Sequence, residues 1–555
     1  MTQTIFEQVF LMLGGIMVFM YGMSFMGSNL EKAAGGKMKK WMSKISNNRL
    51  AGVGIGAGVT AIIQSSAITT VMLVGFVNIG LMTLTQAAAI IMGANIGTTI
   101  TAQIVSLEGL NLFDTTAIAS VVAAAGFIVT LVSKNKTRQR GGRILMGLGM
   151  LFIGLRVMSN AINVLVDEVP AFTQIFLKVS NPILLLVIGI VVTALIQSSA
   201  AITGILIILA GSGAITLEMA IFVTLGSNIG TCVTALISTI GTGVNAKRTA
   251  VIHLLFNLTG VLLVIVPVLV WRTQIADALA TISGPSIQRQ IANFHTVFNL
   301  LTTLVLLPFV NVLVKVASLI VPEKKEDAKA VADSRLKYLD PHILETPPIA
   351  VGQVKKEIIH MADTAFQNYT AAVTTLVDGN YDRIDEIEKT EDDINYLNQQ
   401  IATYLVKIIA SEISTRDKNI LSSYYHVISD IERIGDYAEN IVEYSVRLRD
   451  EHLEFSDEAK KEVLSVYENT KKLYEDVMYT FETRNLDKME EINEVEDSID
   501  DAKTAMSEAH IERLNKGVCT PVTGALYLST ASNLERIADH MVNIAVSVKP
   551  KAQIV

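Results

Sequence analysis

The sequence is poor in cysteine and, over one long stretch, contains no charge at all. Two cysteines, Cys232 and Cys519, lie far apart in 555 residues, which argues against a disulfide framework and for free thiols in a reducing compartment. No aspartate, glutamate, lysine or arginine occurs between Arg49 and Glu108. A soluble surface needs charged residues, so we expect this stretch to lie within a membrane.

Other features are also missing. The N-terminus has no basic region before its first apolar run, so we expect residues 7–30 to be a retained membrane span and not a cleaved signal. No nucleophile–base set and no nucleotide-binding glycine loop occurs. The sequence therefore does not predict an enzyme, and we expect no nucleic-acid partner.

Charge divides the chain into two parts. Residues 1–322 hold 18 Lys+Arg and 8 Asp+Glu, a net charge of +10, whereas residues 323–555 hold 27 and 45, a net charge of −18. The first part is typical of a membrane protein and the second of an acidic soluble domain. We expect a membrane transport domain at 1–321, a linker at 322–346, a helical domain at 347–546 and a tail at 547–555.

Apolar stretches of about 20 residues are long enough to cross a bilayer as helices. Two others, 51–79 and 182–210, are too long for one span and too short for two, and each has a polar cluster near its centre. We expect these to be re-entrant hairpins, since non-helical backbone at membrane depth needs a protein or aqueous environment. The seven expected spans are about 7–30, 84–107, 114–133, 143–165, 216–240, 247–271 and 291–320.

The basic loops agree with this topology. They occur at 31–49, 134–143 and 241–248, and all fall on one side if both hairpins return to the side from which they enter. Basic loops are cytoplasmic, so we expect the N-terminus outside the cell membrane and the C-terminal domain in the cytoplasm.

The membrane part contains a duplication. The sequence Gln-Ser-Ser-Ala occurs at 64–67 and at 197–200, and Gly-x-Asn-Ile-Gly-Thr occurs at 93–98 and at 226–231, so both motifs recur at the same interval along the chain. We expect repeat one at about 7–133, repeat two at about 143–271 and an extra span at 291–320. An odd number of crossings in each unit inverts the second copy, an architecture typical of secondary transporters.

The two Gln-Ser-Ser clusters offer amide and hydroxyl groups beside broken helix ends. Helix starts favour anions and helix ends favour cations, so two facing hairpin tips would suit an oxyanion with alkali cations. Polar side chains that hold helices together in lipid are the alternative explanation. The candidate binding residues are Gln64, Ser65, Ser66, Gln197, Ser198 and Ser199.

The Gly-x-Asn-Ile-Gly-Thr motifs have two interpretations. Their glycines would weaken a helix, and a local break would expose oxygen ligands suited to sodium. Close packing of helices at small residues explains the same pattern equally well. The candidate ligands are Asn95, Thr98, Thr99, Asn228 and Thr231, and position 99 becomes Cys232 in the second copy.

These paired motifs resemble the type II sodium–phosphate cotransporter family over residues 1–320. The resemblance implies sodium-coupled import of inorganic phosphate by alternating access. It places the two Gln-Ser-Ser clusters around phosphate and sodium, with Ser66 and Ser199 as sodium ligands as well. Vertebrate members carry a third serine where this chain has Ala67 and Ala200.

From residue 347 the apolar period becomes that of amphipathic helices, and six fit at 347–378, 383–412, 415–449, 456–483, 485–514 and 519–546. Similar acidic motifs recur in the second half of this part, which predicts two three-helix bundles. Acids four residues apart share a helix face. Two such pairs, Glu432 with Asp436 and Glu535 with Asp539, resemble the metal motifs of PhoU-like regulatory domains. The resemblance implies that a divalent or iron ion could bind. The acids concerned are Glu391, Glu432, Asp436, Glu496, Asp500, Glu535 and Asp539.

The sequence thus predicts an all-α polytopic membrane protein with two inverted repeats, each with a re-entrant hairpin, followed by a PhoU-like pair of three-helix bundles. Its expected partners are inorganic phosphate, sodium and the lipid bilayer, and a homo-oligomer remains open. Two other functions also remain open. One is a membrane-tethered phosphate sensor, and the other is a carrier for another oxyanion such as sulfate.

Overall fold

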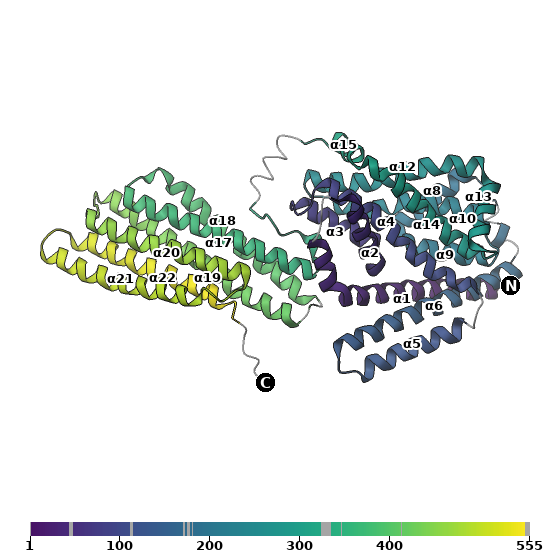
Figure 1. Ribbon diagram of the computed structural model, residues 1–555, viewed down its shortest axis with the longest axis horizontal. Helices are drawn as coiled ribbons and strands as arrows, with labels where there is room; N and C mark the ends of the chain where they lie inside the picture. Colours follow the sequence, from purple (N-terminus) through teal and green to yellow (C-terminus); the bar gives the residue numbers. More distant parts are fainter. Residues whose placement is uncertain are drawn as a thin grey trace. The chain divides into compact units, whose positions relative to one another are not determined.

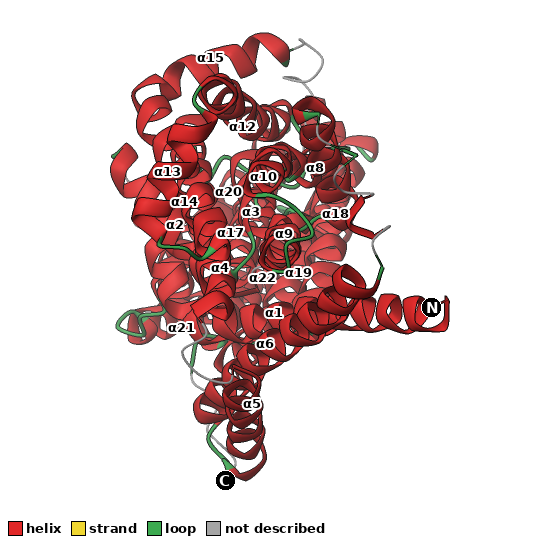
Figure 2. Ribbon diagram, turned by 90° about the vertical axis from the view of Figure 1, so that its right-hand side faces the viewer, coloured by secondary structure: helices red, strands yellow, loops and turns green. Residues whose placement is uncertain are grey.

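The computed structural model describes residues 2–43, 48–110, 115–169, 172–174, 178–179, 181–323, 335–345, 347–411, 413 and 415–549. Every regular element in these ranges is a helix, so the predicted all-α class is confirmed (Figures 1 and 2). The chain forms two compact units. The membrane unit comprises residues 1–332 and 340–345, and the regulatory unit comprises residues 333–339 and 346–555.

The membrane unit consists of long apolar helices joined by short connections. Within the described ranges, six stretches are long and apolar enough to cross a membrane: Ile5–Ala33, Leu84–Ser106, Lys136–Glu168, Leu217–Ser238, Val244–Val270 and Ile287–Ile320. Its helices are α1 (Thr2–Ser43), α2 (Arg49–Ile63), α3 (Ser66–Asn78), α4 (Leu84–Ser106), η1 (Leu107–Leu110), α5 (Thr115–Val132), α6 (Lys136–Glu168), α8 (Pro182–Ile196), α9 (Ser199–Gly211), α10 (Leu217–Gly230), α11 (Cys232–Ser238), α12 (Val244–Val270), α13 (Arg272–Ser283), α14 (Ile287–Leu306), η2 (Leu307–Phe309), α15 (Val310–Ile320) and η3 (Pro341–Glu345).

Two details differ from the sequence-based expectation. The expected span 291–320 is interrupted by the short 3-10 turn Leu307–Phe309, where Pro308 lacks the N–H that would continue the α-helix. The expected break in the Gly-x-Asn-Ile-Gly-Thr motif occurs in the second copy, at Thr231 between α10 and α11. In the first copy α4 runs unbroken from Leu84 to Ser106. The remaining expected span, 114–133, corresponds to α5, an apolar helix of 18 residues.

Both Gln-Ser-Ser stretches form helical hairpins. Helix α2 has 15 residues and α3 has 13, and the matching helices α8 and α9 have the same lengths. Each arm is therefore about 20 Å long, which is short of the roughly 30 Å hydrocarbon layer. The arms of the first hairpin fold together, because the hydroxyl of Thr60 donates to that of Thr69 at 3.0 Å. These lengths fit re-entrant hairpins.

Glycines let each hairpin pack directly onto the next helix. A Cβ added at Gly56 would lie 2.0 Å from the carbonyl oxygen of Ile90, and one at Gly189 would lie 2.2 Å from that of Val223. Gly189 follows Gly56, and Val223 follows Ile90, by the same number of residues that separates the two Gln-Ser-Ser clusters. The second contact is therefore the counterpart of the first. Backbone therefore touches backbone between α2 and α4, and again between α8 and α10.

Helices α1 and α6 cross at a second set of glycines. An added Cβ at Gly15 would lie 2.9 Å from the carbonyl oxygen of Gly154, and one at Gly22 would lie 2.8 Å from that of Gly147. The two helices are antiparallel, since the residue number rises along one helix as it falls along the other.

The regulatory unit is a pair of three-helix sets. Helices α17, α18 and α19 pack on one another, as do α20, α21 and α22. Buried Glu357 of α17 also anchors the preceding segment, because its carboxylate accepts the N–H groups of Tyr338 and Leu339 at 2.6 and 3.0 Å. The elements are α17 (Pro347–Asp378), η4 (Tyr381–Arg383), α18 (Ile384–Ala410), α19 (Thr415–Asp450), α20 (Asp457–Thr483), α21 (Met489–Asn515) and α22 (Pro521–Val546).

The glycine contacts give a paired test of the fold. We expect Gly56→Ala and Gly189→Ala each to lower the free energy of unfolding by about 1–3 kcal/mol, because the new methyl meets a backbone carbonyl. Gly54→Ala is the matched control on the same helix, since an added Cβ there meets nothing within 4 Å. Thermal unfolding of the purified protein measures all three variants. Equal stability of Gly56→Ala and Gly54→Ala would contradict the packing.

Candidate functional site

Each hairpin turns at a glutamine in the left-handed backbone conformation. Gln64 has φ 60° and ψ 23°, and Gln197 has φ 58° and ψ 25°. The N–H of each glutamine bonds to the carbonyl of the threonine four residues earlier, Thr60 or Thr193, at 2.7 Å. A long side chain is rarely found in this conformation, and such positions concentrate at functional sites. The two tips are therefore alike in backbone as well as in sequence.

The serine after each glutamine begins the second arm. Ser65 Oγ accepts the N–H of Ile68 at 3.2 Å, and Ser198 Oγ accepts that of Ala201 at 3.2 Å. A helix start carries unsatisfied N–H groups and a partial positive charge, which together favour anions. The first turns of α3 and α9 thus offer two anion-attracting ends.

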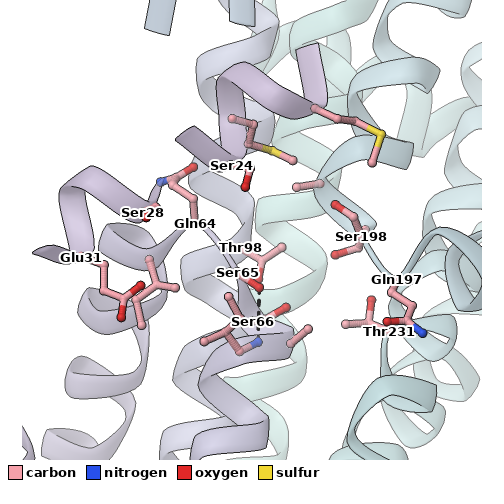
Figure 3. Close-up of a pocket in the computed structure, with 17 residues that line it drawn as sticks. Ser24, Ser28, Glu31, Gln64, Ser65, Ser66, Thr98, Gln197, Ser198 and Thr231 are labelled. Carbon is pink, nitrogen blue, oxygen red and sulfur yellow. Dashed lines mark hydrogen bonds between the residues drawn. The ribbon is translucent and has the colours of Figure 1, made fainter. Parts of the chain in front are cut away.

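Both tips line one pocket of about 260 Å³ (Figure 3). Its volume is slightly below the usual range of pockets for drug-sized ligands and leaves ample room for a small ion. Ala67 and Ala200 are part of the wall, so the third serine of the vertebrate proteins would add its hydroxyl there. The lining residues are Met20, Met23, Ser24, Ser28, Glu31, Ile63, Gln64, Ser65, Ser66, Ala67, Ile68, Thr98, Gln197, Ser198, Ser199, Ala200 and Thr231.

The two glutamines differ in their surroundings. Gln64 is buried, its Oε1 accepts the hydroxyl of Thr101 at 2.7 Å, and its amide donates to the carbonyl of Ala61. Gln197 is exposed. Hydrogen bonds therefore hold the side chain of Gln64, whereas Gln197 remains open to solvent or ligand in this conformation.

The predicted sodium ligands fall into two groups. Thr98 and Thr231 line the pocket, whereas Asn95, Asn228 and Thr99 do not. The amides of Asn95 and Asn228 donate to carbonyls of their own helices at 2.9 and 2.8 Å, and Thr99 likewise donates to Ile96 at 2.8 Å.

The glycines of this motif pack against the hairpin. An added Cβ at Gly97 would lie 2.5 Å from the carbonyl oxygen of Ala57, and one at Gly230 would lie 2.5 Å from that of Ile190. These two glycines therefore serve close helix packing, which is the second of the two interpretations of the motif.

Sequence reasoning missed the three polar pocket residues on α1, namely Ser24, Ser28 and Glu31. Their spacing of four and three residues places them on one helix face. A polar face within an otherwise apolar helix is a signal that could have found them. The long apolar run around them and the single copy of the pattern concealed it.

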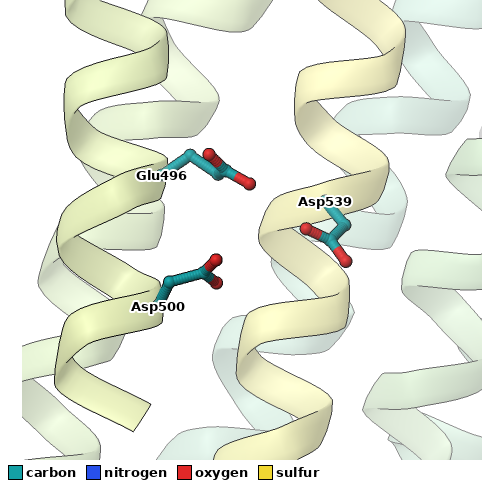
Figure 4. A group of neighbouring side chains, drawn as sticks. All are labelled: Glu496, Asp500 and Asp539. Atoms are coloured by element: carbon teal, nitrogen blue, oxygen red, sulfur yellow. The ribbon is translucent and has the colours of Figure 1, made fainter. Parts of the chain in front are cut away.

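The regulatory unit has an acidic cluster on α21 and α22. Glu496, Asp500 and Asp539 each offer a carboxylate oxygen, and these atoms lie within 4.8 Å of one another (Figure 4). Burial and the neighbouring carboxylates raise the pKa of both Glu496 and Asp539. Carboxylate oxygens suit hard cations, so the donor set fits a metal ion. Glu535 is ion-paired with Lys503 at 2.7 Å.

The matching acids on α18 and α19 surround Glu391. This side chain is 4 % exposed, and neither of its carboxylate oxygens has a hydrogen-bond partner among the described residues. Gly435 makes room for it, since a Cβ there would lie 2.5 Å from Glu391 Oε2. Burial and the carboxylates of Asp436, Glu439 and Glu432 raise the pKa of Glu391 to about 8. A buried, unpaired carboxyl beside other acids also fits a cation.

Comparisons with known proteins identify a family for each of the two units. The family profile described as Na⁺/Pi-cotransporter matches residues 18–160 and 170–284, and the PhoU domain profile matches residues 358–445 and 463–548. YqeW of Bacillus subtilis, an uncharacterized protein, is 30 % identical over 309 residues, which cover 56 % of this chain and 97 % of that protein. The chain belongs to the Na⁺/Pi-cotransporter family.

Two further relatives of this chain carry phosphate in their names. YjbB of Escherichia coli, named as a candidate inorganic phosphate export protein, is 24 % identical over 543 residues, 97 % of this chain and 96 % of its own. Sodium-dependent phosphate transport protein 2A of Rattus norvegicus is 39 % identical over 100 residues, 18 % of this chain and 16 % of its own. The chain is thus a multi-pass membrane protein of a phosphate transport family with a C-terminal PhoU domain.

Glu391 makes the stability of the protein depend on pH. The folded protein holds the Glu391 proton up to about pH 8, whereas the unfolded carboxyl loses it near 4.5. The folded state binds more protons between these values, so we expect stability to fall by up to a few kcal/mol as pH rises through this window. Thermal unfolding from pH 5 to 9 in the presence of a chelator measures it.

Glu391→Gln should weaken this pH dependence, whereas Glu388→Gln, an exposed change on the same helix, should leave it as in the wild type. A wild-type protein and a Glu391→Gln variant with the same slope would contradict the assignment.

Proposed function

We propose that the chain is a sodium-coupled carrier of inorganic phosphate that works by alternating access under the control of its PhoU domain. The observation that carries the proposal is the single pocket lined by both Gln-Ser-Ser tips, Ser66 from one copy and Ser199 from the other among them. Two helix starts supply partial positive charge for the anion, and hydroxyl and carbonyl oxygens supply ligands for sodium.

The charge of the pocket supports sodium coupling. Among the described residues that line it there is no lysine, arginine or histidine. An oxyanion in such a site needs positive charge from elsewhere, because removing a charge from water is unfavourable without a partner. Sodium ions bound in the same pocket would supply that charge, with Thr98 and Thr231 beside the tips as candidate ligands.

The helix contacts support an inverted repeat. Gly15 and Gly22 of α1 correspond to Gly147 and Gly154 of α6, since the interval along the chain is the same for both pairs. The contact between Gly15 and Gly154 therefore corresponds to the contact between Gly147 and Gly22. Each copy therefore contributes the same glycines to the crossing, and the two contacts become one another when the copies are exchanged. Two subunits or repeats related by a two-fold axis make contacts of this kind. Two inverted copies around one site are what rocking between inward and outward states requires.

The direction of transport has two candidates. Coupling to an inward sodium gradient would drive import, with the N-terminus outside and the PhoU domain in the cytoplasm, as the basic loops suggest. The name of the Escherichia coli relative favours export instead, since that relative matches almost the whole chain. The same pocket serves either direction, because the gradients set the net flux.

The PhoU domain supplies the control in this proposal. Glu496, Asp500 and Asp539 would hold one metal ion, and Glu391 with Glu432 and Asp436 a second. A bound cation would offset the repulsion between these carboxylates and stabilise their helices. Occupancy of the two acidic sites would thereby bias the conformation of the domain.

Phosphate flux in proteoliposomes tests transport directly. We expect an inward sodium gradient to accelerate uptake of radiolabelled phosphate several-fold over a choline gradient. Gln64→Gly and Gln197→Gly should each lower uptake about tenfold or more, because glycine keeps the left-handed turn but removes the amide. Thermal unfolding confirms that the variants are folded.

The alternatives give different results in the same vesicles. Uptake that is indifferent to sodium would contradict coupling, and efflux from phosphate-loaded vesicles without sodium would favour export. Phosphate binding without flux in either direction would indicate a sensor. Competition by equimolar sulfate as strong as that by phosphate would indicate a broader oxyanion carrier.

Metal binding by the PhoU domain can be measured by thermal unfolding, independently of transport. After treatment with a chelator and dialysis, we expect Mn²⁺ to raise the unfolding temperature of the regulatory unit in the full chain, in proportion to the logarithm of its concentration. The double variant Glu496→Gln/Asp539→Asn should lose part of this shift. The exposed change Asp501→Asn on the same helix should keep all of it. An unchanged shift in the double variant would refute this metal site.

A further inference from the structure

The chain that links the two units makes specific contacts which the proposed function does not use. The structure describes residues 335–345 of this linker, which we call the strap. Residues 335–339 belong to the regulatory unit, and residues 340–345 belong to the membrane unit. Each part of the strap is held by side chains of its own unit.

The membrane unit holds the strap at the last residue of α3. The amide of Asn78 donates to Asp340 Oδ2 at 2.8 Å, and its Oδ1 accepts the N–H of Gly243, which precedes α12, at 3.0 Å. Asp340 is 3 % exposed, and its carboxylate also accepts the N–H of His342 at 2.8 Å. A buried carboxylate needs such partners. The side chain of Asn78 thus joins the strap to the end of one helix and the start of another.

The strap also packs against the side of α3. A Cβ added at Gly75 would lie 3.3 Å from His342 Cβ and 3.3 Å from Ile343 Cγ1. The side chain of Ile343 is fully buried. Residues 340–345 are therefore part of the packed structure of the membrane unit and move with this arm of the first hairpin.

The regulatory unit holds the other part of the strap through two helices. Glu357 of α17 accepts the three consecutive N–H groups of residues 337–339 at 3.1, 2.6 and 3.0 Å. Arg335 forms an ion pair with Asp393 of α18 at 2.7 Å. Glu391 precedes Asp393 by two residues on the same helix. The strap therefore begins beside the acidic cluster around Glu391.

Helix α3 extends from the strap to the pocket. It begins at Ser66, which lines the pocket, and ends at Asn78, which holds Asp340. Its 13 residues form a rigid element about 20 Å long, so a displacement at one end reaches the other. The second hairpin lacks this attachment, because the interval between the Gln-Ser-Ser clusters places Gly211 at the position of Asn78.

We propose that the strap couples the first hairpin to the acidic cluster around Glu391, so that a change at either one alters the other. The proposal rests on the proposed function and deepens it, since it names the contact through which the PhoU domain acts on the pocket. Asp340 and Asn78 are positioning residues, because neither lines the pocket. Coupling of this kind is reciprocal, so phosphate bound at the tips also alters the strap.

Hydrogen exchange of the full-length protein tests the coupling. The chelator-treated protein in sodium buffer is measured with and without saturating phosphate. In the wild type we expect phosphate to slow exchange at residues 64–70. We also expect it to change the exchange rate at residues 336–339 and 384–394 by at least about threefold, because exchange reports local opening. Asp340→Asn should keep the effect at 64–70 and lose the other two.

Asp340→Asn breaks the contact because the new amide can accept only one of the two hydrogen bonds from Asn78 and His342. The double variant Asn78→Asp/Asp340→Asn exchanges carboxylate and amide, so donor and acceptor meet again and the coupling should return. The control is Glu323→Gln, which removes an exposed carboxylate from the same linker and should behave as the wild type. If thermal unfolding shows that Asp340→Asn is not folded, Asn78→Ala replaces it.

The possible failures give different results. If phosphate leaves exchange at residues 64–70 unchanged in the wild type, the proposed binding site fails and the coupling falls with it. If residues 64–70 are protected but the strap and α18 do not respond, the coupling alone is overturned. An equal response of the strap and α18 in the wild type and Asp340→Asn would also overturn it, because phosphate would then act on them by another route.

Discussion

The membrane unit depends on one constraint, namely that a helix broken within an apolar layer must satisfy its freed backbone groups inside the protein. The chain breaks two helices in this way and uses the same solution twice. In each hairpin the glutamine N–H donates a hydrogen bond to a threonine carbonyl, and the side chain of the following serine caps the next helix. What remains is the first turn of α3 and of α9, whose N–H groups are available to a ligand.

Close packing at glycines brings the two hairpin tips to one pocket. The arms can reach the middle of the unit only if α2 and α8 lie directly on α4 and α10, and Gly56 and Gly189 make that approach possible. The α1–α6 crossing then relates the two copies through its paired glycines. The pocket between the two tips is therefore a consequence of backbone contacts, and its polar side chains complete it.

Sequence reasoning found the tips because identical motifs at one interval cannot be explained by apolar composition. It also found the six regulatory helices, since their amphipathic period is long and regular. The expected span 291–320 lies within the apolar stretch Ile287–Ile320, and Pro308, already visible in the sequence, marks the 3-10 turn inside it. The glycines of α4 weaken a helix by only about 1 kcal/mol each, which close packing on α2 offsets.

Other features could not be read from one sequence. The closeness of Glu496 to Asp539 depends on how two amphipathic helices meet, and Glu31 joins the pocket through the packing of α1 beside the first hairpin. Such pairings are tertiary, and no local spacing encodes them. The sequence therefore predicted which hairpin residues meet in the pocket better than it predicted which residues from other helices would join them.

The central claim is that one oxyanion binds between the two hairpin tips. Crystals grown with sodium and arsenate, an analogue of phosphate with an anomalous X-ray signal, would test it most directly. The account predicts one anomalous peak between the first turns of α3 and α9, within hydrogen-bond distance of Ser66 and Ser199. A peak that contacts only one tip, or that lies outside this pocket, would contradict it.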